Sequence, residues 1–556
     1  MRDESGRATW RPARVRALQS VGLSIVLLVA TCPLSFPLSF PERAAGQEAT
    51  TEIIVTTNSD VSNGDTSTVA ALKANPGPDG ISLREAIFTT NNDPGSHMIR
   101  FDAALAGATI TVDTALPPLL AGGVTIDGDV DGDAAPNITI SAGPAGDANL
   151  GFHIGSGNNR LHALKLSGFR LGVFFGPLAT PEEFPTNTTF ADNSVDGLVM
   201  ENVGFGIDVE SVSCGNDPNF PPPCPSYNTW ANTTITNNTI EASGPGIKFF
   251  ISGTGDRVEG ATITDNVVHL GADASEGIAV SLAGNSDGGR ISDVLIARNS
   301  VEGEADIGIY VTGGDGRAQG GITEGVRILS NSIHLVKQSP KFCCQGIVIN
   351  AGSDNPSFAT GPPVRYLDDN TARDVVVRNN AVSGTLEWGI ALQAAWGGGG
   401  RRNHVRDIRI KQNVVRTSLP RLGVIVVNGG GTPYDDRYTS DNRIAGVVIA
   451  SNRFAIGTGP DFRNAGPGIM AAGIALIGGG SWSRDNVVRD VRMARNTIKS
   501  SYFGIEIIGG LEDTARRNRV ICVPLRDNRI RGARKDVSIR ANVRGAIGNK
   551  VRLGAC

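Results

Sequence analysis

A pattern of apolar and polar positions thirteen residues long recurs along the chain. One copy, NHVRDIRIKQNVV, begins at Asn403, with Asn at the first and eleventh positions and apolar or β-branched residues at the sixth, eighth and thirteenth. Five further copies begin at Asn228, Asn370, Asn442, Asn486 and Asn518. Alternation within a copy predicts a strand with one buried face. Ile408 and Ile410 are therefore expected to point inward, and Arg409 and Lys411 outward.

A second apolar segment follows the copies after a loop of variable length. It begins with Gly-Ile at Gly277, Gly308, Gly346, Gly389, Gly473 and Gly504. The second Asn of successive copies recurs at intervals of 28 to 49 residues, from Asn238 to Asn528. A constant core with variable loops predicts one solenoid rod of at least nine coils, with parallel sheets and no second globular domain. Equivalent Asn side chains are expected to stack in a hydrogen-bonded ladder, at turns where Asn tolerates the left-handed conformation.

The segment DGISLREAIFTTNN, residues 79–92, predicts an amphipathic helix. Ser82 and Glu85 have the spacing of a capping box, and Leu83, Ala86 and Ile87 form one apolar stripe. A solenoid needs a cover over its first coil, and this helix is suited to that task.

The repeats and the helix together resemble the right-handed parallel β-helix proteins of the pectate-lyase-like superfamily. The helical segment is similar to the CSLREA-type N-terminal module of exported bacterial β-helix proteins, with Ile81 in place of the cysteine. The resemblance implies an all-β, right-handed parallel β-helix solenoid with a short N-terminal capping helix. We expect an export segment at 1–46, the cap at 47–123 and β-helix repeats at 124–556. Function does not follow from the fold alone.

The tripeptide Arg409-Ile410-Lys411 also occurs in the active sites of some pectin-cleaving hydrolases. Those enzymes are expected to carry Asn-Thr-Asp and Gly-His-Gly motifs as well, and this sequence contains neither. The three residues occupy ordinary positions of the repeat, so the sequence does not indicate a pectic hydrolase.

The N-terminus predicts export. An arginine-rich start precedes an apolar run from Val21 to Cys32, which is short for a bilayer span but suits the core of a signal peptide. Cleavage is expected near residues 45–47. Lipidation at Cys32 is the alternative, although Thr31 is a poor preceding residue. We expect a secreted or cell-surface protein whose mature chain has no transmembrane segment.

Export implies an oxidising compartment, in which cysteines pair. Six cysteines follow the export segment: Cys214, Cys224, Cys343, Cys344, Cys522 and Cys556. The expected bridges are Cys214 with Cys224, which bracket a short loop, and Cys522 with Cys556. For the adjacent Cys343 and Cys344, a strained vicinal disulfide and two free thiols are both open. No Cys-x-x-Cys spacing indicates zinc or redox chemistry.

Charge is distributed unevenly along the chain. Residues 1–370 carry 21 Lys and Arg against 41 Asp and Glu, whereas residues 371–556 carry 30 against 14, a balance of +16. In the repeat alignment one outward column contains Arg327, Arg409 and Arg492, and the next contains Arg378, Lys411 and Arg526. This asymmetry indicates that the C-terminal half meets a polyanion. Solvated arginine, screened by salt, is the alternative.

Aromatic residues gather in the same half. Trp396, Tyr434 and Trp482 each follow a Gly-Ile-type strand, so we expect them on one side of the solenoid. Aromatic faces stack on sugar rings and arginine forks bind carboxylates or sulfates, which predicts a glycan groove. The candidate groove residues are Trp388, Trp396, Arg401, Arg402, Tyr434, Asp435, Asp436, Trp482, Arg484 and Glu506. Rings that merely cover loop hydrophobics are the alternative.

The chemistry that such a groove implies is β-elimination from a uronic-acid polymer. A cation neutralises the carboxylate, and a base removes the neighbouring proton. The candidate bases are His404, Arg409 and Lys411, although all three occupy repeat positions.

The segment DGDVDGD indicates a metal. Asp127, Asp129, Asp131 and Asp133 follow the alternating spacing of calcium loops, although Ile138 stands where the twelfth-position acid belongs. Calcium is therefore the candidate cofactor, in a structural role. An acidic turn without metal is the alternative.

Two functions remain open. The first is binding of an acidic polysaccharide or cell-surface glycan, with cleavage by a lyase rather than a glycoside hydrolase if the protein is an enzyme. The second is a non-catalytic adhesin or structural spine, which the missing catalytic motifs favour. Nucleic acid is not an expected partner, and the protein is expected to be a monomer.

Overall fold

The computed structural model describes most of the chain beyond residue 49. The described residues are 50–147, 149–177, 186–211, 227–284, 286–316, 318–336, 344–353, 368–396, 400–418, 423–431, 438–456, 472–499 and 502–554. Glu48–Cys556 forms one compact unit, so the expected cap and repeats share it. Among the described residues, no helix is both long and apolar enough to cross a membrane.

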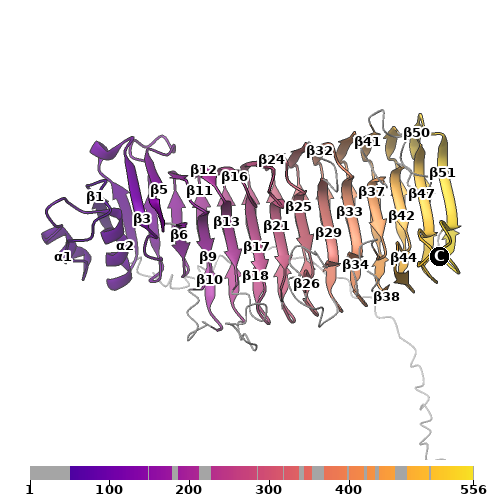
Figure 1. Ribbon diagram of the computed structural model, residues 1–556, viewed down its shortest axis with the longest axis horizontal. Coiled ribbons are helices and arrows are strands. Elements are labelled where there is room, and N and C mark those ends of the chain that lie inside the picture. The colour runs from indigo at the N-terminus through magenta and orange to yellow at the C-terminus, as the bar shows by residue number, and fades with distance from the viewer. Residues whose placement is uncertain are drawn as a thin grey trace, which may run out of the picture. The chain divides into compact units, whose positions relative to one another are not determined.

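The start of this unit combines short strands with two helices, at one end of the stacked strands (Figure 1). Its first elements are β1 (Thr51–Val55), α1 (Val69–Ala74), α2 (Leu83–Asn92), β2 (His97–Phe101) and β3 (Thr109–Thr114). Helix α2 has the predicted capping box: the Ser82 hydroxyl accepts from the Glu85 amide, and the Glu85 carboxylate accepts from the Ser82 amide at 2.9 Å. Leu83, Ala86 and Ile87 are fully buried in the core that continues into the solenoid, so the apolar stripe of α2 faces this core.

Each regular coil contributes four short strands. One coil consists of β34 (His404–Arg406), β35 (Arg409–Lys411), β36 (Val414–Thr417) and β37 (Gly423–Asn428). Each strand pairs in parallel with its equivalent in the next coil. The resulting sheets, numbered by their order in the coil, are sheet 1 with 11 strands, sheet 2 with 14, sheet 3 with 13 and sheet 4 with 12. These stacked parallel sheets are a β-helix, and more than nine coils are present, as predicted (Figure 1).

Alternation within each strand places the core as predicted. Ile408 and Ile410 are fully buried, whereas Arg409 is exposed and Lys411 is half-buried. The Gly-Ile segments form sheet 4, where Ile347, Ile390 and Ile425 occupy equivalent inward positions of adjacent strands. One continuous hydrophobic core therefore runs through the coils, inside all four sheets.

Asparagine ladders hold the turns between coils. One ladder joins Asn238, Asn266, Asn299, Asn331, Asn380, Asn413, Asn452, Asn496 and Asn528. At Asn413, both the backbone N and Nδ2 donate to Oδ1 of Asn452, at 2.9 and 3.0 Å, and Nδ2 also donates to the carbonyl of Val377 at 3.0 Å. A second ladder joins Asn370, Asn403, Asn442, Asn486, Asn518 and Asn549. The predicted ladders are confirmed, and they satisfy turn groups that would otherwise be buried without partners.

The expected backbone conformation at these turns was assigned to the wrong residue. The left-handed residue is the one before the ladder asparagine, for example Gln412, Ser451 and Arg495, with φ of 59°, 57° and 54°. The asparagine that follows is buried and bonds across the coils. The exposed residue therefore makes the turn, and the asparagine is selected for the ladder.

The predicted disulfides mostly involve residues that the structure does not describe. Cys344 and Cys522 are buried, with 1% and 4% of their surface exposed. Cys214, Cys224, Cys343 and Cys556 lie outside the described residues. The two expected bridges therefore stay predictions.

Candidate functional site

Sheet 2 carries two outward columns of basic residues. In the observed register, one column runs through Arg327, Val376, Arg409, Val448 and Arg492. The next column runs through Leu329, Arg378, Lys411, Ala450, Ala494 and Arg526. The predicted columns are confirmed, and the structure adds the smaller apolar residues that stand between their basic members.

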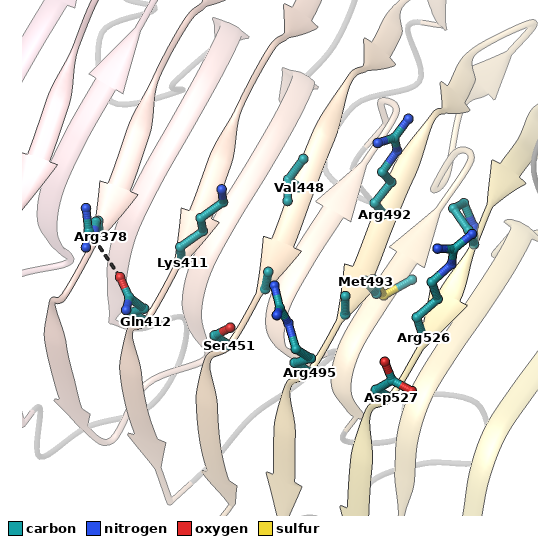
Figure 2. A pocket seen from close by; sticks show the side chains of 13 residues that line it. Arg378, Lys411, Gln412, Val448, Ser451, Arg492, Met493, Arg495, Arg526 and Asp527 are labelled. Carbon is teal, nitrogen blue, oxygen red and sulfur yellow. Dashed lines mark hydrogen bonds between the residues drawn. The ribbon is translucent and has the colours of Figure 1, made fainter.

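A hollow of about 780 Å³ opens on sheet 2 where small side chains interrupt these columns (Figure 2). Neighbouring strands lie about 4.8 Å apart, so Lys411 and Arg526 start about 14 Å apart, with Ala450 and Ala494 between them. Long side chains thus surround a base of short ones. The contributing strands are β31 (Val376–Arg378), β35, β40 (Val447–Ala450), β45 (Val491–Ala494) and β49 (Leu525–Arg526). The lining residues are Arg378, Lys411, Gln412, Val448, Ala450, Ser451, Arg492, Met493, Ala494, Arg495, Pro524, Arg526 and Asp527.

Cationic side chains dominate the hollow. Five lining residues are Lys or Arg, and Asp527 is the single acidic one. Arg378 donates from Nε to Oε1 of Gln412 at 2.7 Å (Figure 2). Within the described part of the chain, the side chains of the other four cations have neither a hydrogen-bond nor an ion-pair partner; they are Lys411, Arg492, Arg495 and Arg526. Their uncompensated charge gives the hollow a positive potential that attracts anions.

Arginines at the corner between sheets 4 and 1 are different, because carboxylates already neutralise them. Arg402 donates through Nε and a terminal nitrogen to the two oxygens of Asp369, at 2.8 and 2.7 Å. Arg517 forms the same two-pronged pair with Asp485, at 2.9 and 2.6 Å. The predicted groove residue Arg402 is therefore less available to an anionic ligand than the cations of the hollow.

Three other predicted groove residues come together at this corner. The rings of Trp482 and Tyr438 meet edge to face, 5.3 Å between centroids. The guanidinium of Arg484 lies 5.5 Å from the centre of the Tyr438 ring. The backbone of Arg401 forms a β-bridge with Ser440, which in turn pairs with Arg484 of the next coil. The structure thus groups Arg401, Trp482 and Arg484, and adds a tyrosine that the sequence analysis did not select.

Three further predicted groove residues, Trp388, Trp396 and Glu506, lie on strands of sheet 4. Trp388 is buried, and its ring contacts Trp396 edge to face at 4.8 Å. Glu506 lies on the outer face of sheet 4, buried and ion-paired with Arg540. Burial raises the pKa of Glu506 despite the opposing effect of Arg540. Tyr434, Asp435 and Asp436 lie outside the described residues, so a single aromatic groove stays a prediction.

The three candidate bases lie in different surroundings. His404 is half-buried on sheet 1, where burial and the nearby Arg443 and Arg406 lower its pKa. Arg409 is exposed on sheet 2, outside the lining of the hollow. Lys411 is the one of the three that lines the hollow.

The acidic turn groups three of the four proposed calcium ligands. Asp129, Asp131 and Asp133 each bring one carboxylate oxygen within 4.8 Å of the others. Asp127 instead accepts from the amide of Asp129 at 3.2 Å and lies 3.9 Å from Arg100. Carboxylate oxygens are the ligands that calcium prefers, so the group of three fits this ion better than the full set of four.

Sequence reasoning found the basic columns but missed the hollow. The missing information was the size of the intervening residues, since Val448, Ala450 and Ala494 could have been recognised as gaps once the copies were aligned. Arg495 was also missed, because it occupies the turn position before the ladder asparagine rather than a strand.

The sequence matches no protein-family model and no curated protein. Among solved structures, the A-module of mannuronan C-5 epimerase AlgE6 from Azotobacter vinelandii is similar at 12% identity and a TM-score of 0.35, over 82% of this chain and 90% of that one. A tailspike protein of the E. coli bacteriophage HK620 is similar at 12% identity and a TM-score of 0.40, over 84% and 76% of the two chains. The catalytic unit of a GH87 α-1,3-glucanase from Streptomyces thermodiastaticus strain HF3-3 is similar at 13% identity and a TM-score of 0.32, over 68% and 64%.

Proposed function

We propose that the C-terminal half of the solenoid binds an acidic polysaccharide in the hollow on sheet 2. The observation that carries this proposal is the set of four unpaired cations around short side chains. A chain of carboxylated or sulfated sugars supplies several anions along its length, and the four cations surround the short side chains at the base of the hollow. The ordered column supports this function better than scattered surface arginine, because its charges converge on one concave site.

The arrangement of the cations supports binding of an anionic polymer more directly than its cleavage. Lys411 lines the hollow and is also a candidate base, so cleavage by β-elimination is tested together with binding. His404 and the corner group lie on other parts of the coil. The proposed partner is therefore an acidic glycan, held mainly by charge and by the shape of sheet 2.

The experiment measures equilibrium binding of pectate, alginate, hyaluronan and chondroitin sulfate to four forms of the full chain, one of which is Trp482→Ala at the corner group. The wild type is compared with Arg492→Met combined with Arg526→Met, which removes two cations of the hollow. The matched control, Arg531→Met combined with Arg534→Met, removes two cations that do not line the hollow. Unsaturated product is followed by absorbance in the same samples.

At least one polymer should bind the wild type, and the hollow variant should weaken that binding at least tenfold. Binding should also weaken with salt, because exposed charges are screened. Equal weakening by both double variants would show a diffuse basic surface instead. Loss of binding with Trp482→Ala, and none with the hollow variant, would move the site to the corner group.

Two further proposals rest on the sequence and the acidic turn. Calcium is proposed to bind Asp129, Asp131 and Asp133, the three carboxylates that the structure groups. The protein is proposed to act outside the cell, on the basis of the signal-like N-terminus.

A further inference from the structure

A second cluster of ionisable residues lies on the outer face of sheet 4, in the N-terminal coils. Its strands are β9 (Leu171–Phe175), β13 (Phe205–Glu210), β17 (Ile247–Ile251) and β21 (Glu276–Leu282). Asp208 pairs across strands with Lys248, and Glu210 with Phe250. Ile207 and Val209 point into the core, so the acidic residues between and beyond them point outward. Neither the repeat alignment nor the predicted groove includes any of these positions.

The ammonium of Lys248 joins the two carboxyl groups. Its Nζ lies 3.8 Å from Oδ2 of Asp208 and 3.7 Å from Oε2 of Glu210. The exposed fraction of the side chain is 14% for Lys248, 8% for Asp208 and 28% for Glu210. Glu276 is also buried nearby and interacts electrostatically with Lys248. Three carboxyl groups therefore share one cation in a place with little water.

Burial and charge perturb every member of the cluster. Burial raises the pKa of Glu210 to about 7, although the charge of Lys248 acts in the opposite direction. Burial likewise raises the pKa values of Asp208 and Glu276. For Lys248, burial acts to lower the pKa, but the neighbouring carboxylates raise it further, so the ammonium stays charged.

One carboxylate oxygen of the cluster lacks a partner. Oδ1 of Asp208 is buried and has no hydrogen-bond partner in the structure. A buried acceptor without a donor is unfavourable, so a ligand that donates a hydrogen bond to it is favoured on binding. Beside it, the Nζ of Lys248 lies 4.2 Å from the centre of the Phe250 ring and 5.9 Å from that of Phe205. Acceptors, a donor and aromatic rings thus lie together on the outer face of sheet 4, buried or half-buried.

A purely structural role does not account for this cluster. Further along the same outward column, the next positions are Ala279, Tyr310, Val348, Ala391 and Val426. Apolar residues therefore suit this face of sheet 4. Replacing a buried ion pair by apolar residues is often neutral or stabilising, so stability alone does not account for three acids and a lysine at these positions.

The chemistry of the cluster selects its ligand. The excess of carboxyl groups repels an acidic glycan, and the ammonium of Lys248 between Asp208 and Glu210 disfavours a metal ion. Among the described residues, the set with metal-ligand spacing is Asp129, Asp131 and Asp133, not this cluster. Uncharged sugars remain, because their hydroxyl groups donate to carboxylates and accept from an ammonium, and their apolar faces stack on aromatic rings.

We propose that Asp208, Glu210 and Lys248 form a binding site for an uncharged sugar unit with adjacent hydroxyl groups. Oδ1 of Asp208 accepts from one hydroxyl, Glu210 binds the next, and Lys248 holds the two carboxyl groups in place and donates to a ring substituent. The site is separate from the hollow on sheet 2 and does not depend on it.

The test is calorimetric titration of the full chain with uncharged hexasaccharides of glucose, mannose, galactose and N-acetylglucosamine. The variants are Asp208→Asn and Glu210→Gln, which keep size and remove charge. The matched control is Glu241→Gln, which changes an exposed glutamate on sheet 3. Thermal unfolding is recorded for each form.

At least one hexasaccharide should bind the wild type with little dependence on salt, and Asp208→Asn should weaken it at least tenfold. The control and the Arg492→Met, Arg526→Met variant should bind it as the wild type does. The proposal is overturned if no hexasaccharide binds at millimolar concentration, or if neither cluster variant changes the affinity. A fall in melting temperature for both variants without any sugar binding would establish a structural ion network instead.

Discussion

Glu210→Gln should change the pH dependence of stability in a direction that the structure fixes. The pKa of Glu210 is raised from its usual 4.5 to about 7 in the folded protein, mainly by burial. A carboxyl group with a raised folded pKa binds its proton more tightly in the folded state than in the unfolded state. Its contribution is therefore fully present below pH 4.5 and is lost as the pH rises through 7.

The magnitude follows from the size of this shift. A difference of about 2.5 pH units corresponds to about 3 kcal/mol of stability lost between pH 4.5 and pH 8. Glutamine stays neutral at all these pH values, so the variant does not lose this energy. For a body of about 500 residues, an unfolding entropy of about 2.1 cal/mol/K per residue converts 3 kcal/mol into about 3 °C. If groups of coils unfold separately, the entropy is smaller and the shift in melting temperature is larger.

The assay is thermal unfolding of wild type and Glu210→Gln at pH 5, 6, 7 and 8, followed by circular dichroism. The two melting temperatures should agree closely at pH 5, and the variant should become more stable by about 3 °C or more at pH 8. Glu241→Gln, an exposed change of the same type, should show a constant difference across the series. A variant that is less stable than wild type at pH 8 would refute the reasoning, because Glu210 would then be stabilised as the anion.

Two further predictions concern the ladder and the acidic turn. Asn413→Ala should destabilise the protein by about 2–4 kcal/mol, because the backbone N and Nδ2 of Asn380 both lose their acceptor. Chemical unfolding measures this loss, with the exposed change Ser332→Ala as the control. An equal loss of stability in both variants would contradict the role of the ladder. Calcium should raise the melting temperature of the wild type, and Asp131→Asn combined with Asp133→Asn should abolish that rise. Differential scanning calorimetry with calcium or with a chelator measures both. If calcium does not change the melting temperature of the wild type, the acidic turn does not bind it.

The regular part of the fold was predictable because its physical causes are local and repeated. The alternation around Ile408 and Ile410 fixes the inward face of a strand, and the recurrence of asparagine fixes where successive coils come into register. The basic columns follow directly from that register. Helix α2 was also predictable, since the Ser82–Glu85 box and one apolar stripe define it within a few residues.

The sites were less predictable because they depend on contacts between coils with irregular spacing. Asp208 and Lys248 meet across two coils that precede most of the clear copies, so no sequence motif connects them. Trp388 was a candidate groove residue, yet it lies in a strand of sheet 4 and is buried against Trp396. The burial of an aromatic side chain depends on neighbours that the sequence alone does not place. The ion pair between Arg402 and Asp369 likewise forms between two successive coils, so it depends on how those coils stack.

The measurement that tests the hollow most directly is the dissociation constant of the best-binding acidic polysaccharide for Ala494→Phe. This change keeps every cation and fills the space between Lys411 and Arg526. The matched control is Ala455→Phe on sheet 3, where alanine likewise stands between two basic residues, Arg416 and Lys499. The account predicts at least tenfold weaker binding for Ala494→Phe and unchanged binding for Ala455→Phe. Wild-type affinity in Ala494→Phe would contradict it, because the glycan would then be held by surface charge and not in the hollow.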